Sequence, residues 1–125
     1  MAFKANPGGP SHLKARERVV RLLQSRGFIV EPDEVEFNGC LTELGERNYT
    51  ADIVATLKLI VEIDGKDHGS RIHKHKDEVR DDYFRHIQNA PTIRIAQDVA
   101  VGKKKMSDAL LMAEFCYQIF SKGVM

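Results

Sequence analysis

The chain has 125 residues, of which 42% are apolar and 30% are charged, and its formal net charge is +1. This length fits one small domain, and the composition is that of an ordinary soluble globular protein rather than a disordered chain or a polycation. No apolar run approaches the ~20 residues that span a bilayer, and residues 1–10 lack the apolar core of a signal peptide. Cys40 and Cys116 make neither a disulfide framework nor a four-ligand zinc site, so a reducing, intracellular location is the simplest expectation.

Charge is distributed unevenly along the first part of the chain. Residues 1–26 carry six basic side chains and one acid, whereas residues 27–46 carry six acids and no base. A basic segment beside an acidic one permits local phosphate binding, and on charge alone a solvated helix face explains it equally well.

We expect a flexible lead over residues 1–10, where Pro and Gly cluster, and a single domain over residues 11–125. In that domain, Ser11 is predicted to cap a helix that runs to about Arg26 and ends at Gly27.

The faces of this first helix are predicted from its apolar spacing. Its buried stripe is expected to contain Leu13, Val19, Val20 and Leu23. Arg18 is expected to lie opposite, in water, and Glu17 lies at the edge of the stripe, from which it can reach inward. Arg16 falls within the stripe, and the sequence offers no account of it.

The middle of the chain is predicted to form strands separated by turns. The predicted strand segments are Phe28–Val30, a segment around Val35 and Phe37, Tyr49–Thr56, Leu59–Asp64 and Thr92–Ala96. Turns are predicted at Asn38-Gly39 and at Gly45 to Asn48.

Two further helices are predicted, over Lys74–Gln88 and from the cap Ser107 to about Ser121. The order of elements indicates an α+β fold, an α/β sandwich in which helices flank a mixed central sheet. The last helix is apolar on nearly all sides, which predicts that it is buried or that it packs on something outside this chain, either a dimer partner or a further, DNA-binding domain.

Carboxylates interrupt the most apolar predicted strands. Because side chains alternate along a strand, Glu62 and Asp64 share one face, and a hairpin would bring Asp52 beside Glu62. Such acids repel one another when buried, and Mg²⁺, which prefers carboxylate oxygen, offsets that repulsion. We therefore predict a Mg²⁺ site formed by these three acids, at which Mn²⁺ can substitute. The alternative is that they are exposed strand residues paired with Lys58 or Lys66.

The segments Thr50-Ala51-Asp52 and Glu62-Ile63-Asp64 resemble the two halves of the PD-(D/E)XK nuclease motif. A helix that carries an acid, here Glu17, is typical of that superfamily, and the resemblance covers about residues 11–96. It implies a restriction-endonuclease-like core and metal-dependent hydrolysis of DNA. The chain departs from the usual motif at Asp64, where the family commonly has lysine.

A more specific likeness is to the very-short-patch repair endonucleases and to phage homing endonucleases with an EDxHD signature. In this comparison Glu17 supplies the E, Asp52 supplies the first D, and Asp64 occupies the variable position. His68, just beyond the strand, supplies the H. The resemblance implies that His68 assists proton transfer and that Glu17 binds or orients the metal or its water.

The last acid of the signature falls on the helix predicted from Lys74, at Asp77, which we favour, or at Asp81. These two acids and Arg80 can instead form a surface salt-bridge set at helical spacing. For His68 the alternatives are an ordinary hydrogen-bonded loop histidine and a zinc site shared with two nearby histidines, His73 and His75.

Basic side chains near the predicted site are candidates for contacts to a DNA backbone. Arg71, Lys74 and Lys76 form a basic rim together with His73 and His75. A second group lies in a predicted loop and consists of Lys103, Lys104 and Lys105. For this second group, plain solvation is the alternative.

The sequence thus predicts a Mg²⁺-dependent DNA endonuclease whose partner is DNA and not a membrane. The resemblance implies products with a 3′-hydroxyl and a 5′-phosphate. Two other functions stay open: a phage-type Holliday-junction resolvase, and a non-catalytic DNA-binding subunit with a degenerate nuclease site.

Overall fold

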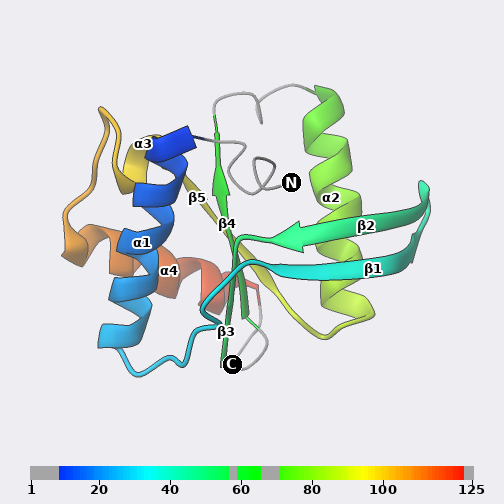
Figure 1. Cartoon of the computed structure of the whole chain (residues 1–125), viewed down its shortest axis with the longest axis horizontal. Coiled ribbons are helices and arrows are strands. Elements are labelled where there is room, and N and C mark those ends of the chain that lie inside the picture. The colour runs from blue at the N-terminus through cyan, green and yellow to red at the C-terminus, as the bar shows by residue number, and fades with distance from the viewer. Residues whose placement is uncertain (1–8, 57–58, 66–70, 123–125) are drawn as a thin grey trace.

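A three-stranded sheet separates a group of helices on one side from a single helix and a β-hairpin on the other (Figure 1). The computed structural model describes residues 9–56, 59–65 and 71–122. In chain order the elements are α1 (Gly9–Ser25), β1 (Val35–Thr42), β2 (Gly45–Ala51), β3 (Ile53–Ala55), β4 (Leu59–Asp64), α2 (Arg71–His86), β5 (Thr92–Ala96), α3 (Gln97–Ala100) and α4 (Asp108–Ser121).

The central sheet has the strand order β3-β4-β5 and is mixed. β3 pairs antiparallel with β4, and β4 pairs parallel with β5, to which it is connected through α2. β1 and β2 form a separate antiparallel hairpin that projects beside α2 in Figure 1. Helices and a mixed sheet confirm the predicted α+β class.

Strand β4 buries both of its faces, which explains its dense apolar sequence. Val61 and Ile63 belong to the larger core, in which α1, α3 and α4 cover the sheet. Ile60 packs on the other side against Phe84 of α2. Glu62 shares the face of Ile60, as strand alternation predicts, so an acid lies under α2 within a hydrophobic layer.

The strands β4 and β5 and the start of α4 lie as the sequence predicts. The β1–β2 hairpin differs from the sequence prediction in the position of its turn. Both predicted turns are wrong. Residues 38 and 39 lie within β1, where the register shifts and Gly39 has a φ of 70°, and residues 45–48 lie within β2. The turn lies at Glu43 and Leu44. The predicted strand at Phe28–Val30 reduces to one bridge between Val30 and Ala55.

Four predictions about α1 are wrong. Ser11 does not cap the helix, because α1 begins at Gly9 and Ser11 lies inside it. Leu13 is exposed, and Arg18, expected in water, is 7% exposed. The Arg18 guanidinium donates from Nη1 to the Ala100 carbonyl at 2.7 Å and from Nη2 to the Met106 carbonyl at 2.7 Å. Glu17 is exposed rather than turned inward. The stripe is rotated because a guanidinium can be buried where backbone carbonyls receive its protons.

Helix α4 buries only part of its apolar surface. Leu111, Met112 and Phe115 are buried, whereas the large side chains of Leu110, Tyr117 and Phe120 are exposed. The packing of α4 on a dimer partner or a further domain stays a prediction. None of the helices in the described part of the chain combines the length and the hydropathy that a bilayer crossing requires.

We predict that Arg18→Met lowers the free energy of unfolding by about 2 kcal/mol, because two carbonyls lose their donor. The contact to Asp108 adds little, because that carboxylate is 70% exposed. Urea unfolding followed by circular dichroism measures the change. Arg21→Met, at an exposed position of the same helix, is the matched control and should alter stability by less than about 0.5 kcal/mol. Equal effects of both substitutions would contradict this role of Arg18.

Candidate functional site

A bend at Asp52 separates β2 from β3. The register of β3 and β4 pairs Ile53 with Val61, so a straight strand would bring Ala51 opposite Ile63. Instead Ala51 pairs with Val35 of β1, and the Asp52 carboxylate Oδ2 accepts a hydrogen bond from the Ile63 backbone N at 2.7 Å. The side chain of Asp52 thereby fastens the bend to β4.

Helix α1 supports the bend from the other side. Arg16 Nε donates to the Asp52 backbone carbonyl at 2.7 Å, and His12 Nε2 lies 3.5 Å from Asp52 Oδ2. The hydrogen bond to Asp52 raises the pKa of His12, against the effect of its burial. Two basic side chains of α1, one turn apart, therefore fix the Asp52 bend.

Glu62 lies beside Asp52 and is almost completely buried, with 5% of its surface exposed. Its Oε2 accepts hydrogen bonds from the Asp52 backbone N at 3.2 Å and from Arg80 Nη2 at 2.9 Å. Burial, and then the charge of Asp52, raise the pKa of Glu62 to about 8, although Arg80 opposes the shift. The predicted approach of Asp52 and Glu62 is confirmed.

Arg80 comes from α2 and is held over the sheet by aromatic rings. Its Nη2 also donates to the Thr50 carbonyl at 2.7 Å, and its Cζ lies 5.2 Å from the ring centre of Tyr49 and 5.8 Å from that of Phe84. Arg80 therefore does not form a surface set with Asp77 and Asp81, because its guanidinium is directed at the buried acid instead.

The remaining predicted acids gather around Arg94 of β5. Its Nη1 donates to Asp64 Oδ1 at 2.9 Å, and Nε and Nη2 bind the two oxygens of Asp81 at 3.1 and 2.7 Å. Asp77 Oδ1 lies 3.5 Å from Nη2. Asp64, expected as a metal ligand, is thus an ion-pair partner of Arg94, and the structure brings both candidates for the last acid to one guanidinium.

Acidic side chains outnumber guanidinium groups in this part of the molecule, and the raised pKa of Glu62 lowers the negative charge that they carry together. The guanidinium groups of Arg80 and Arg94 and the imidazole of His12 face five carboxyl groups, those of Asp52, Glu62, Asp64, Asp77 and Asp81, whereas Arg16 binds the backbone carbonyl of Asp52. Within the described residues, Asp52 Oδ1 and Glu62 Oε1 accept no hydrogen bond. The two neighbouring acids therefore each retain an oxygen for a further cation.

In the part of the chain that the structure describes, no three side chains of His, Cys, Asp or Glu are arranged so that they could together hold a metal ion. Mg²⁺, however, keeps several waters and commonly takes one or two protein carboxylates together with substrate phosphate. The chemistry of the Asp52 and Glu62 pair fits that mode of binding.

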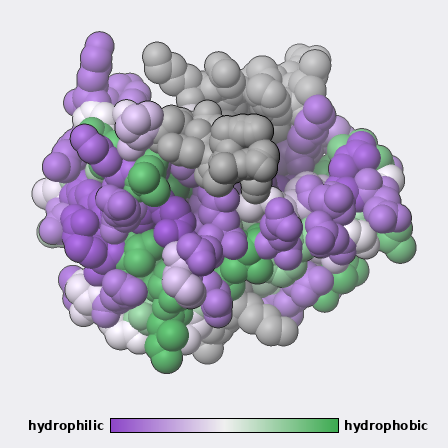
Figure 2. All heavy atoms as spheres, in the orientation of Figure 1, coloured by the Kyte–Doolittle hydropathy of each residue, from purple (hydrophilic) through white to green (hydrophobic). Residues whose placement is uncertain are grey.

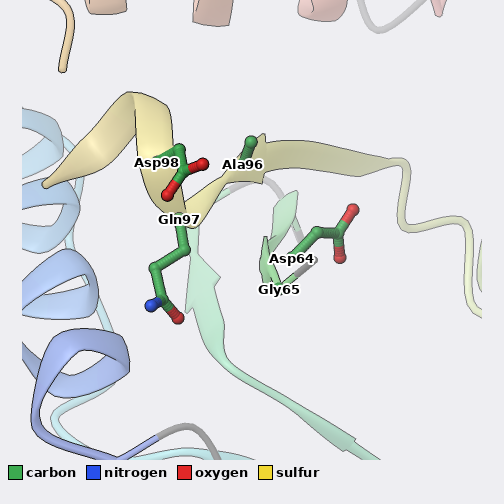
Figure 3. Close-up of a pocket in the computed structure, with 5 residues that line it drawn as sticks. All are labelled: Asp64, Gly65, Ala96, Gln97 and Asp98. Atoms are coloured by element: carbon green, nitrogen blue, oxygen red, sulfur yellow. The ribbon is translucent and has the colours of Figure 1, made fainter. Parts of the chain in front are cut away.

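A small cleft lies next to this site at the carboxyl ends of the parallel strands (Figure 3). Asp64 and Gly65 line it from the end of β4, and Ala96, Gln97 and Asp98 line it from the end of β5 and the start of α3. Clefts at carboxyl ends of parallel strands are common ligand sites in open sheets.

The other predicted site residues either lie outside the described residues or are exposed on α1, on α2 and in the loop after α3. His68 and Lys66 fall outside the described residues, and so do the side chains of Arg71 and His73, so the sequence predictions for them, including the zinc site, stay predictions. Lys74 and Lys76 are exposed on α2, and Lys103, Lys104 and Lys105 are exposed in the loop after α3.

Sequence reasoning missed four basic residues at the site: His12, Arg16, Arg80 and Arg94. The unexplained Arg16 in a buried stripe was the one available signal, because a cation on an apolar face requires a partner. Comparisons of the chain with protein-family models, with curated proteins and with solved structures gave no match.

We predict that stability declines as the pH rises from about 4.5 toward 8, because the folded protein retains a proton on Glu62 that the unfolded chain releases. Above about 6.5, His12 contributes in the same direction, since its pKa is also raised. Glu62→Gln should therefore remove the loss of stability that accompanies a rise in pH from about 4.5 to about 6.5. Urea unfolding in EDTA at a series of pH values measures it.

Glu46→Gln, an exposed position on β2, is the control and should keep the wild-type pH dependence. A Glu62→Gln variant whose stability still declines between pH 4.5 and 6.5 would show that Glu62 is not the responsible group.

Proposed function

We propose that this chain is a Mg²⁺-dependent endonuclease domain that hydrolyses phosphodiester bonds in DNA, with Asp52 and Glu62 as the metal-binding pair. The observation that carries the proposal is the meeting of these two carboxylates at the β2–β3 bend, each with one oxygen that no described residue occupies. As part of the same proposal, the mixed sheet and its flanking helices are assigned to a restriction-endonuclease-like core.

The roles of the protein groups follow from their contacts. The Ile63 amide and Arg16 fix the bend, so Asp52 presents its carboxylate to the same side as Glu62. Arg80 stabilises Glu62 in its ionised form, which is the form that binds a cation. When bound, Mg²⁺ would polarise a phosphate oxygen and lower the pKa of a bound water. His68, as the resemblance implies, would assist proton transfer.

A specific observation favours the non-catalytic alternative. Arg80 and Arg94 already compensate Glu62 and Asp64 at 2.9 Å each, as in a purely structural ion-pair network. In that case the protein binds DNA without cutting it. Cleavage therefore decides between the two functions.

We predict that the protein nicks or linearises supercoiled plasmid in Mg²⁺ and that EDTA abolishes the activity. Asp52→Asn and Glu62→Gln should each lower the rate by about 10²-fold or more, because each removes a charge that holds the metal. Glu46→Gln, which changes an exposed acid of β2, is the control and should retain the wild-type rate within about twofold.

Two outcomes would count against the proposal. Equal cleavage by wild type, Asp52→Asn and Glu62→Gln would assign the activity to a contaminant. DNA binding without cleavage in Mg²⁺ or Mn²⁺ would favour the non-catalytic subunit. A four-way junction compared with a linear duplex of the same sequence tests the resolvase alternative, which requires preference for the junction.

A further inference from the structure

The loop between α3 and α4 is closed by backbone hydrogen bonds and carries three exposed lysines, Lys103, Lys104 and Lys105. Two backbone hydrogen bonds close it, from the Met106 N to the Val99 carbonyl at 2.9 Å and from the Lys105 N to the Gly102 carbonyl at 3.1 Å.

The start of this loop packs tightly against α3. An added Cβ at Gly102 would lie 2.6 Å from the Cα of Asp98, so the close approach requires glycine. The lysines are therefore held at a defined place on the surface.

Arg18 attaches this loop to α1. Its guanidinium bonds the Ala100 and Met106 carbonyls, one at each end of the loop. Lys14 and Arg21 are the i−4 and i+3 neighbours of Arg18 on the helix, so they lie on the side of α1 that faces the loop, and both are exposed.

Five cations thus gather around one buried arginine. We call them the basic face: Lys14, Arg21, Lys103, Lys104 and Lys105. Figure 2 shows hydrophilic side chains gathered over α1 and this loop. Three acids adjoin this face, Glu17, Asp98 and the exposed Asp108, whose Oδ1 accepts from Arg18 Nη2 at 2.6 Å, so the five cations still exceed the acids.

Exposed charges also lie elsewhere on the molecule. The β1–β2 hairpin, on the other side of the sheet, exposes Glu36, Glu43 and Glu46. The hairpin also exposes Arg47, and α2 exposes Lys74, Lys76 and Arg85, so the basic face is one of two groups of exposed cations to which a polyanion would be attracted.

We infer that the basic face is the docking surface for the phosphate backbone of duplex DNA, an inference that rests on the proposed function for the identity of the polyanion. The loop begins at α3, whose first residues, Gln97 and Asp98, line the cleft next to Asp64. A backbone bound along the loop would thus lie near the cleft that Asp64 lines.

The composition of the basic face favours a nucleic acid over an anionic membrane. A peripheral membrane surface combines cations with apolar side chains that insert into the bilayer. Of the large exposed apolar side chains in the described part of the chain, Leu13 lies about 100° around α1 from Lys14, and Leu110, in the first turn of α4, is the one that follows the loop.

The test measures binding without cleavage. Fluorescence anisotropy of a labelled duplex of about three helical turns is recorded in EDTA between about 50 and 200 mM salt. The variant Lys103→Gln/Lys104→Gln/Lys105→Gln should bind about tenfold or more weakly and show a salt slope reduced by about two, since each phosphate contact contributes about 0.9. Lys14→Gln/Arg21→Gln should reduce the slope by about one to two.

Two double variants serve as comparisons. Arg47→Gln/Arg85→Gln removes two exposed charges from β2 and α2 and should bind within about twofold of wild type. Lys74→Gln/Lys76→Gln tests the basic residues of α2. Loss of binding in this last variant, with normal binding by the loop variant, would overturn the inference.

The remaining outcomes separate this inference from the nuclease proposal. Duplex binding through the basic face without cleavage would support the inference and refute the nuclease. Cleavage with normal binding by both basic-face variants would refute the inference alone. Wild type that sediments with phosphatidylserine vesicles but does not bind the duplex would assign the basic face to a membrane and also overturn the inference.

Discussion

The burial of one carboxylate, that of Glu62, constrains much of this structure. A charge in an apolar layer is strongly unfavourable unless it is hydrogen-bonded and paired. Arg80 and the Asp52 amide supply those contacts, and each places a further demand on the fold. Arg80 has to cross from α2 between Tyr49 and Phe84, and the chain has to bend at Asp52. The position of α2 and the break between β2 and β3 are therefore coupled to the same acid.

The arginine partners give the site two properties at once. They make a cluster of five acids compatible with a stable fold, and they leave an oxygen of Asp52 and an oxygen of Glu62 without a described partner. Breaking a buried pair is costly because the other charge remains buried, so removal of either arginine would disturb the fold and the acid pair together. Away from the acid cluster, Arg18 is another buried arginine that joins two elements, because it binds α1 to the loop that carries the lysines of the basic face.

The fold was largely readable from local pattern. Strands β4 and β5 and the Ser107 cap, whose side chain accepts from the Leu110 N, lie where the sequence predicted them, because alternation, dense apolar sequence and capping are local properties. The β1–β2 hairpin could not be predicted from local pattern in the same way. A glycine with positive φ is compatible with a turn or with an irregular strand, and only pairing with β2 decided that Gly39 lies in a strand.

For the site, the sequence by itself determined that Glu62 and Asp64 share a face and that Asp52 can approach Glu62, because strand alternation and a hairpin fix both. Tertiary structure decided the partners of the long basic side chains. Arg16 finds its acceptor 36 positions away, Arg94 binds an acid 30 positions away, and Arg18 reaches 88 positions to Met106. A guanidinium on a long, rotatable stem pairs with whatever acceptor the packing of distant elements brings near, and periodicity carries no information about that distance.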